Sequence, residues 1–156
     1  MIELSIPGHG ILKIEYLWCD VNGTLAVDGI LLPGMISAIK TIKDRVKVYL
    51  ITANTHGKQD SLSTDLDVES IIINKGQEAK QKGEFVEKLG KEKVIAIGQG
   101  LNDAEMLEKA AIGICVLSEE GTSTKSINAA DIVVKDGLQA IKLVQNPMRM
   151  VATLRR

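Results

Sequence analysis

The chain has 156 residues, of which 45% are hydrophobic and 25% are charged, and its formal net charge is −1. This size and composition are typical of one soluble globular domain, and we treat residues 1–156 as one. The small net charge gives no electrostatic reason to expect nucleic acid or an anionic membrane surface as a partner, and no apolar run approaches the roughly 20 residues that span a bilayer.

The N-terminus lacks the basic and then apolar segments of a secretory signal. The two cysteines, Cys19 and Cys115, lie within apolar, strand-like runs. Buried thiols of this kind suit a reducing compartment better than a disulfide or a metal pair, so we expect a cytoplasmic protein.

Residues 1–15 predict a β-hairpin, because two β-prone runs flank the turn residues 7–10. After this extension, the core covers residues 16–144. Residues 145–156 are expected to be a solvated basic tail, with an oligomer contact as the alternative. Within residues 26–32, the pair Asp28-Gly29 predicts a tight turn between two short extended pieces.

The core alternates apolar runs with helical patterns. We expect strands at residues 16–20, 46–51, 70–73, 94–97, 112–116 and 132–134, and helices at 33–43, 56–66, 77–89, 102–109, 121–129 and 138–144. Strands that alternate with helices indicate a parallel sheet with right-handed crossovers, covered on both faces. The predicted fold is therefore a doubly wound, Rossmann-like α/β domain.

Polar side chains follow the ends of several strands. The first strand ends at Asp20, which is followed by Asn22 and Thr24, and the second ends at Thr52. Further along the chain, Lys82 lies near the start of a helix, and a fourth strand leads to three polar residues: Gln99, Asn102 and Asp103. Open α/β sheets bind ligands at the carboxyl ends of their strands. A carboxylate nucleophile, phosphate-binding donors and oxygen ligands for Mg²⁺ suit phosphoryl transfer.

These residues resemble the motifs of the haloacid dehalogenase (HAD) superfamily, and most of all its branch of soluble P-type-ATPase-like hydrolases. The resemblance rests on Asp-Val-Asn-Gly-Thr-Leu at 20–25, Thr52, Lys82, and Gly-Gln-Gly-Leu-Asn-Asp at 98–103. It covers about residues 16–144. It implies a Mg²⁺-dependent phosphatase or phosphotransferase that forms an aspartyl phosphate.

The resemblance also implies a role for each residue. Asp20 is the nucleophile and a Mg²⁺ ligand, and Lys82 pairs with it and neutralises developing charge. Thr52 and the Ala53 amide would hold phosphoryl oxygens, and Asn102 would contact the phosphoryl group. Besides Asp20, the Mg²⁺ ligands would be the backbone carbonyl of Asn22, Gln99 and Asp103, the last directly or through water.

Two positions depart from the family pattern. Asn22 stands where most family phosphatases have an aspartate that acts as general acid and base, and an amide cannot transfer that proton. Gln99 replaces the usual metal-binding aspartate and brings no charge. Asn22 favours an activated phosphate donor or a slowly hydrolysed phosphoenzyme, and Gln99 predicts a weak Mg²⁺ site. Together they leave open a second interpretation, a phosphate- or protein-binding module with little turnover.

Several other interpretations remain open at this point. Lys75 and Lys80 compete with Lys82, which the motif spacing favours. Asn102 also suits the N-cap of a helix, and His56 is a candidate for substrate choice. The chain has no room for a cap domain, so the site is expected to be open to large phosphorylated substrates or covered by a second copy, with the N-terminal hairpin as an extra interface. A detached phosphorylation domain that docks on another protein is a further alternative.

Overall fold

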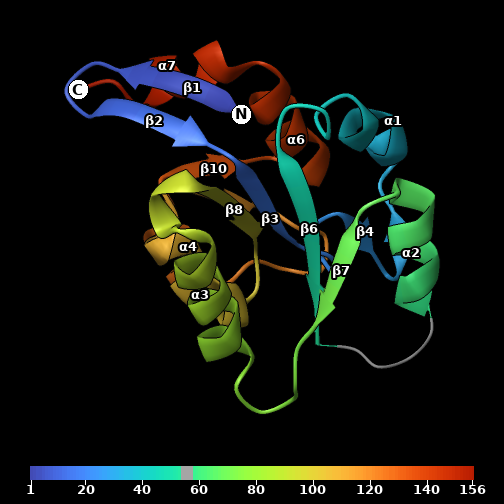
Figure 1. Ribbon diagram of the computed structural model, residues 1–156. Coiled ribbons are helices and arrows are strands. Elements are labelled where there is room, and N and C mark those ends of the chain that lie inside the picture. The colour runs from blue at the N-terminus through green and yellow to red at the C-terminus, as the bar shows by residue number, and fades with distance from the viewer. Residues whose placement is uncertain (54–57) are drawn as a thin grey trace.

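The computed structural model describes residues 1–53 and 58–156, and it is built around a six-stranded parallel sheet (Figure 1). The strand order is β10-β9-β8-β3-β6-β7. The strands are β3 (Tyr16–Asp20), β6 (Lys47–Thr52), β7 (Glu69–Ile72), β8 (Val94–Gly98), β9 (Ile112–Val116) and β10 (Ile132–Val134). The order reverses at β3, which lies between β8 and β6. The predicted doubly wound α/β fold is thus confirmed, and Asp20 ends the strand at its switch point.

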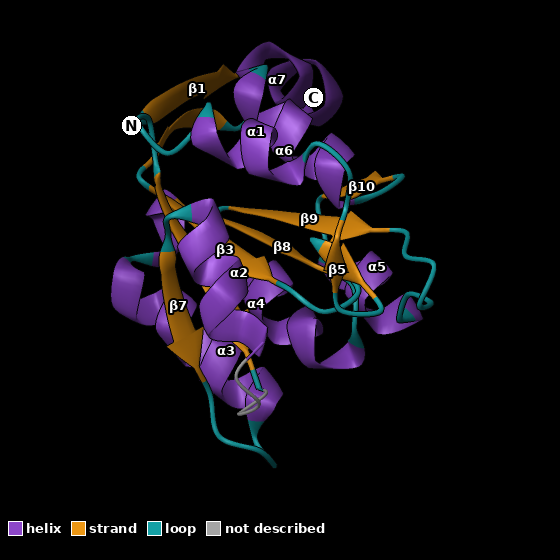
Figure 2. Cartoon of the chain, turned by 90° about the vertical axis from the view of Figure 1, so that its right-hand side faces the viewer, coloured by secondary structure: helices purple, strands orange, loops and turns teal. Residues whose placement is uncertain are grey.

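Helices cover both faces of this sheet, as Figures 1 and 2 show. Three of them pack on the face that contains Leu17 and Cys19: α1 (Met35–Lys40), α2 (Lys58–Leu66) and α6 (Gly137–Gln145). Three others lie on the face that contains Trp18: α3 (Glu78–Leu89), α4 (Ala104–Lys109) and α5 (Thr124–Ala129). Because side chains alternate along a strand, Asp20 points to the same face as Trp18, toward α3.

Two antiparallel hairpins are added to this core. The N-terminal one joins β1 (Ile2–Ile6) to β2 (Gly10–Ile14), as predicted. The other joins β4 (Ala26–Val27) to β5 (Ile30–Leu31) and forms a flap after Asp20. Asp28 and Gly29 have φ values of 50° and 79°, as a type I′ turn requires. Together with the 3₁₀-helices η1 (Lys91–Lys93) and η2 (Leu101–Asp103), these hairpins complete the elements before the last helix.

The prediction of a solvated tail at residues 145–156 is wrong, because most of this segment forms the helix α7 (Pro147–Leu154). Met150 of α7 is fully buried, and Val151 and Leu154 pack against the same core as the apolar face of β1. The backbone N–H of Arg156 also donates to the carbonyl of Pro7 at 3.0 Å. Figure 2 shows α7 beside the hairpin. The partner of α7 is therefore at the other end of the chain.

Other boundaries differ by a few residues. The helix predicted to reach residue 43 ends at Lys40, because the Thr41 hydroxyl and N–H both bond to the Ala38 carbonyl and turns follow. The short helix predicted from residue 121 begins at Thr124. Between β6 and α3 the described residues form only α2 and β7, which leaves no cap domain in this part of the chain. His56, the candidate for substrate choice, lies outside the described residues.

Candidate active site

A buried lysine bridges two carboxylates at the carboxyl edge of the sheet. The ammonium of Lys82, on α3, lies 2.8 Å from Asp20 Oδ1 and 2.6 Å from Asp103 Oδ1. The Lys82 side chain is 1% exposed and that of Asp103 is fully buried, whereas Asp20 keeps 11% of its side chain exposed. Asp20 is therefore the member of this group that solvent reaches most.

The other two lysine candidates do not reach this site. Lys75 and Lys80 are both exposed. The ammonium of Lys80 lies 3.8 Å from Glu84 on the surface of α3. Of these three lysines, Lys82 is the one that contacts Asp20, and its catalytic role stays a prediction.

Burial and charge shift the pKa values of this group. Burial, together with the nearby charge of Asp103, raises the pKa of Asp20 to about 7, although the Lys82 ammonium and hydrogen bonds oppose this shift. Burial lowers the pKa of Lys82, but the attraction of the two carboxylates outweighs it and raises that pKa overall. Lys82 therefore stays charged, and the site holds one cation between two acids.

The loop after β3 holds Asp20 in a fixed orientation. The Thr24 hydroxyl donates to Asp20 Oδ2 at 3.0 Å, so each carboxylate oxygen of Asp20 has one donor. Gly23 takes a φ of 78°, and the next three backbone N–H groups converge on the carbonyl of Val21. This nucleophile loop (residues 21–25) also lies tightly against α6, since a Cβ at Gly137 would come within 2.0 Å of the Thr24 carbonyl oxygen.

The loop after β8 is organised by Asp103. Its Oδ2 accepts the N–H groups of Gln99 and Gly100 at 2.9 and 3.0 Å. Gly98 leaves room for this turn, because a Cβ there would meet Asp103 Cβ at 2.6 Å. With its other oxygen on Lys82, Asp103 is fully engaged with donors and buried. This arrangement disfavours Asp103 as a direct Mg²⁺ ligand, one of the options that the resemblance implied.

Asn102 lies on η2 and does not cap α4, which corrects the N-cap interpretation. The residue that precedes α4 is Asp103, and no side chain caps that helix. Asn102 is instead exposed at the mouth of the site, with its Oδ1 at 3.4 Å from the Lys82 ammonium. The phosphate contact predicted for Asn102 stays a prediction.

Thr52 and Ala53 follow the strand next to Asp20. Asp20 pairs with Ile51 across the β3–β6 ladder, so Thr52 lies one residue beyond the level of Asp20. The Thr52 side chain is buried, and its carbonyl accepts the N–H of Ile73 at 2.9 Å. The sheet thus brings this pair to the same edge as Asp20, where the predicted phosphate contacts stay a prediction.

Gln99 forms a contact that sequence reasoning missed. Its Nε2 donates to the carbonyl of Gly121 at 3.1 Å, and a Cβ at Gly23 would come within 2.6 Å of the same nitrogen. The backbone carbonyl of Gln99 also accepts the N–H of Ser123 at 2.9 Å. Gln99 therefore links the nucleophile loop to the loop after β9 (residues 117–123). The only sequence signal for this contact is the departure from aspartate at this position.

Ser126 of α5 is another residue that the sequence did not single out. Its side chain is fully buried, and its hydroxyl donates to the carbonyl of Gly100 at 2.5 Å. This bond fixes the loop that presents Asn102 and Asp103. A serine on a short helix carries no sequence signal of such a role.

Oxygen ligands for Mg²⁺ are present but sparse. Among residues 1–53 and 58–156, no three His, Cys, Asp or Glu side chains lie close enough to hold a metal ion. Asp20 supplies one partly exposed carboxylate, and carbonyl oxygens of Asn22 and Gln99 are neutral. Mg²⁺ is commonly held by one or two carboxylates together with substrate phosphates and waters. The residues present fit Mg²⁺ in a site that a phosphoryl group completes.

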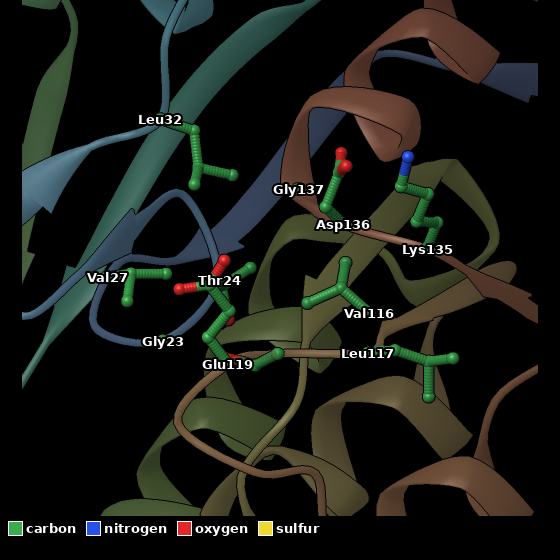
Figure 3. Close-up of a pocket in the computed structure, with 11 residues that line it drawn as sticks. Gly23, Thr24, Val27, Leu32, Val116, Leu117, Glu119, Lys135, Asp136 and Gly137 are labelled. Carbon is green, nitrogen blue, oxygen red and sulfur yellow. The ribbon is translucent and has the colours of Figure 1, made fainter.

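Two hollows flank the nucleophile. One of about 680 Å³ lies between η2 and the start of α3, and its lining includes Asn102 and Gly76. The other, of about 270 Å³, lies between the flap, the loop after β9 and the start of α6 (Figure 3). Its lining includes Thr24, Glu119 and Lys135. Asp20 lines neither hollow, but each contains one residue that is hydrogen-bonded to the Asp20–Lys82 pair: Asn102 in the first and Thr24 in the second.

Comparison with known families agrees with this geometry. The family model of haloacid dehalogenase-like hydrolases matches residues 3–111, well over half of the chain. The chain belongs to this family. The resemblance inferred from the four motifs is thereby confirmed, and the chain is a member of a hydrolase family.

Relatives of known sequence and structure extend the comparison. A probable copper-exporting P-type ATPase from Archaeoglobus fulgidus is 30% identical over 138 residues, which cover 84% of this chain but only 16% of the pump. An uncharacterized protein from Methanocaldococcus jannaschii is 45% identical over 84 residues, 51% of this chain and 90% of that protein. This chain therefore corresponds to a small part of the pump.

Solved structures share the fold at low identity. The 3-deoxy-D-manno-octulosonate 8-phosphate phosphatase of Moraxella catarrhalis, solved with a magnesium ion, a phosphate ion and a KDO molecule, superposes with a TM-score of 0.70. The two sequences are 17% identical, and the match covers 91% of this chain and 94% of that one. At this identity the likeness establishes the fold of this chain.

Proposed function

We propose that this HAD-family protein is a Mg²⁺-dependent phosphohydrolase or phosphotransferase that forms an aspartyl phosphate on Asp20. The observation that carries the proposal is the buried Asp20–Lys82–Asp103 bridge at the carboxyl edge of the sheet. Such an arrangement holds one carboxylate ready for attack and places a permanent cation beside it, where negative charge develops during phosphoryl transfer.

The proposed chemistry has two steps. A carboxylate oxygen of Asp20 forms a bond to phosphorus while the bond between phosphorus and the leaving oxygen breaks. An oxygen of water, or of another acceptor, then forms a bond to phosphorus while the bond between Asp20 and phosphorus breaks. The proton of the acceptor passes to solvent, and the Asp20 carboxylate is regenerated. Thr24 and Lys82 keep the Asp20 carboxylate oriented, and Asn102 lies where it can donate to a phosphoryl oxygen. When bound, Mg²⁺ supplies positive charge to the phosphoryl oxygens.

Asn22 narrows the substrate class. Its side chain is exposed at the site entrance and is an amide, which cannot protonate a departing alkoxide. The proposed substrates are therefore acyl phosphates or phosphoanhydrides, whose leaving groups depart without a proton. The open hollow beside Asn102 also accommodates a large substrate.

The proposed location of the reaction is the cytoplasm, because both cysteines are free and buried. No helix among the described residues is long and apolar enough to cross a bilayer.

A phosphoenzyme assay tests this proposal. The protein is incubated with acetyl phosphate and Mg²⁺, quenched in acid and weighed as an intact chain. We expect the added mass of one phosphoryl group in the wild type and none in Asp20→Asn. Asp44→Asn, the same chemical change at an exposed position, is the matched control and should behave as wild type.

A binding module is the second candidate, favoured by Asn22 and by the neutral Gln99. It predicts that inorganic phosphate binds, as seen by broadening of its ³¹P resonance, while no phosphoenzyme forms and acetyl phosphate is not consumed. That combination of results would overturn the enzymatic proposal.

A further inference from the structure

Gln99 occupies the position from which the resemblance expects a metal ligand, yet its side chain is engaged elsewhere. The Nε2 bond to Gly121 and the close approach to Gly23 place the amide between two loops, and the Gln99 backbone carbonyl holds Ser123 as well. An aspartate at this position is shorter by one methylene and has no N–H to donate to a carbonyl. We call the contacts of the Gln99 side chain with Gly121 and Gly23 the latch, and they depend on glutamine itself.

The charge left for a metal is small. Asp103 is neutralised by Lys82 and by two backbone N–H groups, so its carboxylate is not available to a cation. Asp20 shares the same ammonium. When Asp20 is ionised, Asp20, Lys82 and Asp103 together carry a single negative charge before a substrate binds. A divalent ion that is strongly hydrated gains little by entering such a site.

A bound phosphoryl group changes this balance. It adds up to two negative charges and oxygen ligands directly beside Asp20. We infer that Mg²⁺ binds this protein together with the phosphoryl group and only weakly before it, because Gln99 serves as a latch between the two loops instead of as an anionic ligand. This inference rests on the proposed function and specifies how its metal site is assembled.

Linkage makes the inference quantitative. If phosphate tightens metal binding by some factor, the metal must tighten phosphate binding by the same factor. We expect a factor of about tenfold or more in the wild type, within the usual range of coupling between two sites. Both halves of the cycle can be measured without turnover.

The test uses Mn²⁺ as the probe ion and electron paramagnetic resonance of free Mn²⁺ as the readout, with and without saturating inorganic phosphate. Titrations without protein give the Mn²⁺ that phosphate binds by itself. In the wild type, the Kd for Mn²⁺ should fall about tenfold or more when phosphate is present. In Gln99→Asp, Mn²⁺ should bind without phosphate, and the coupling factor should shrink.

Two control variants separate charge from shape. Gln99→Asn has the size of aspartate without its charge, so it should lose the latch yet bind Mn²⁺ alone as weakly as the wild type. Hydrogen exchange at the Ser123 amide should then be faster. Asn128→Asp adds a carboxylate at an exposed position of α5 and should change neither quantity.

Two results would overturn the inference: equal Mn²⁺ affinity with and without phosphate in the wild type, or a gain in Gln99→Asn that equals the gain in Gln99→Asp. The ³¹P linewidth of phosphate shows whether phosphate binds, and so whether this inference alone fails or the proposed function fails with it. If phosphate binds but leaves the Kd for Mn²⁺ unchanged, only the coupling fails. If phosphate does not bind at all, the proposed function fails with it.

Discussion

At the scale of single residues, the site is a set of buried charges that compensate one another. Lys82 is enclosed, and its three protons are shared among Asp20, Asp103 and, at 3.4 Å, Asn102. A buried charge of this kind costs several kcal/mol unless it is paired. Each member of the bridge therefore has a structural role in addition to its proposed chemical one, and the two roles can be separated by choice of variant.

Replacing Lys82 by methionine should strongly destabilise the fold. The change leaves Asp20 and Asp103 facing each other without a cation, and breaking a buried pair in this way costs about 3–5 kcal/mol. Urea denaturation measures the loss in the free energy of unfolding. The double variant Lys82→Met with Asp103→Asn removes the repulsion and should recover part of the loss. A double variant less stable than Lys82→Met alone would contradict the bridge as the cause.

The pKa of Asp20 predicts how stability depends on pH. Its pKa is raised to about 7 in the folded protein, from an ordinary value of 3.8. Between these values the folded chain holds a proton that the unfolded chain has released. The stabilising contribution of this group is therefore complete below the lower value and is lost as the pH rises through about 7.

Asp20→Asn tests this dependence because asparagine does not titrate. We expect its free energy of unfolding to fall less than that of the wild type between about pH 4 and pH 8 without Mg²⁺, and to exceed it at the upper end. Asp44→Asn serves as the exposed control. Parallel curves for wild type and Asp20→Asn would show that the carboxylate does not titrate as described.

At the scale of elements, two glycines allow close packing, one of α6 against the nucleophile loop and one of α4 against α3. The start of α6 lies against the Thr24 carbonyl at Gly137, and α4 lies against α3 at Gly83. At the first contact a new Cβ would meet backbone, at 2.0 Å, whereas at the second it would meet the flexible side chain of Glu105, at 2.7 Å. A side chain added at Gly83 can therefore be accommodated by movement of Glu105, whereas one added at Gly137 requires the backbone to move.

Gly137→Ala should displace the nucleophile loop or α6. We expect a loss of about 1–3 kcal/mol in the free energy of unfolding and weaker binding of phosphate, because Thr24 orients Asp20. Gly83→Ala is the matched change within a helix, where alanine is favoured, and should cost less. Denaturation curves and ³¹P titrations of both variants measure the difference. An equal or smaller effect at Gly137 would exclude α6 as a support of the loop.

At the scale of the whole molecule, the two ends of the chain pack together. The apolar residues of β1 share a core with α7, so this face of the hairpin is already covered within one chain. The remaining exposed apolar side chains here include Ile11 and Met148, at 62% and 73%. The hairpin as an interface between two copies stays a prediction, and it would have to use the outer surface.

Two methionines of α7 test this packing. Met150 is fully buried, and Met148 is largely exposed. Met150→Ala should cost about 2–5 kcal/mol in the free energy of unfolding through the cavity it creates. Met148→Ala should stay within about 0.5 kcal/mol of the wild type. A similar, small effect of both variants on the denaturation midpoint would mean that α7 contributes little to the fold.

The sequence by itself determined the fold class and the six core strands, and its motifs singled out Asp20, Lys82 and Asp103 as site residues. Apolar runs that alternate with helical patterns have few solutions, and parallel strands bring their carboxyl ends to one edge, so Asp20, Thr52 and the 98–103 loop had to converge there. Motif spacing also separated Lys82 from Lys75 and Lys80. These features depend on local pattern and on topology, which a sequence records directly.

Only the tertiary structure decided which partner each polar group takes. It assigned both oxygens of Asp103 to Lys82 and to backbone N–H groups, turned Gln99 toward Gly121, and converted the expected tail into α7. Each of these contacts joins segments that are distant in the sequence or depends on which of several donors lies within about 3 Å. Residue type and spacing limit the set of possible partners, but packing in three dimensions selects among them.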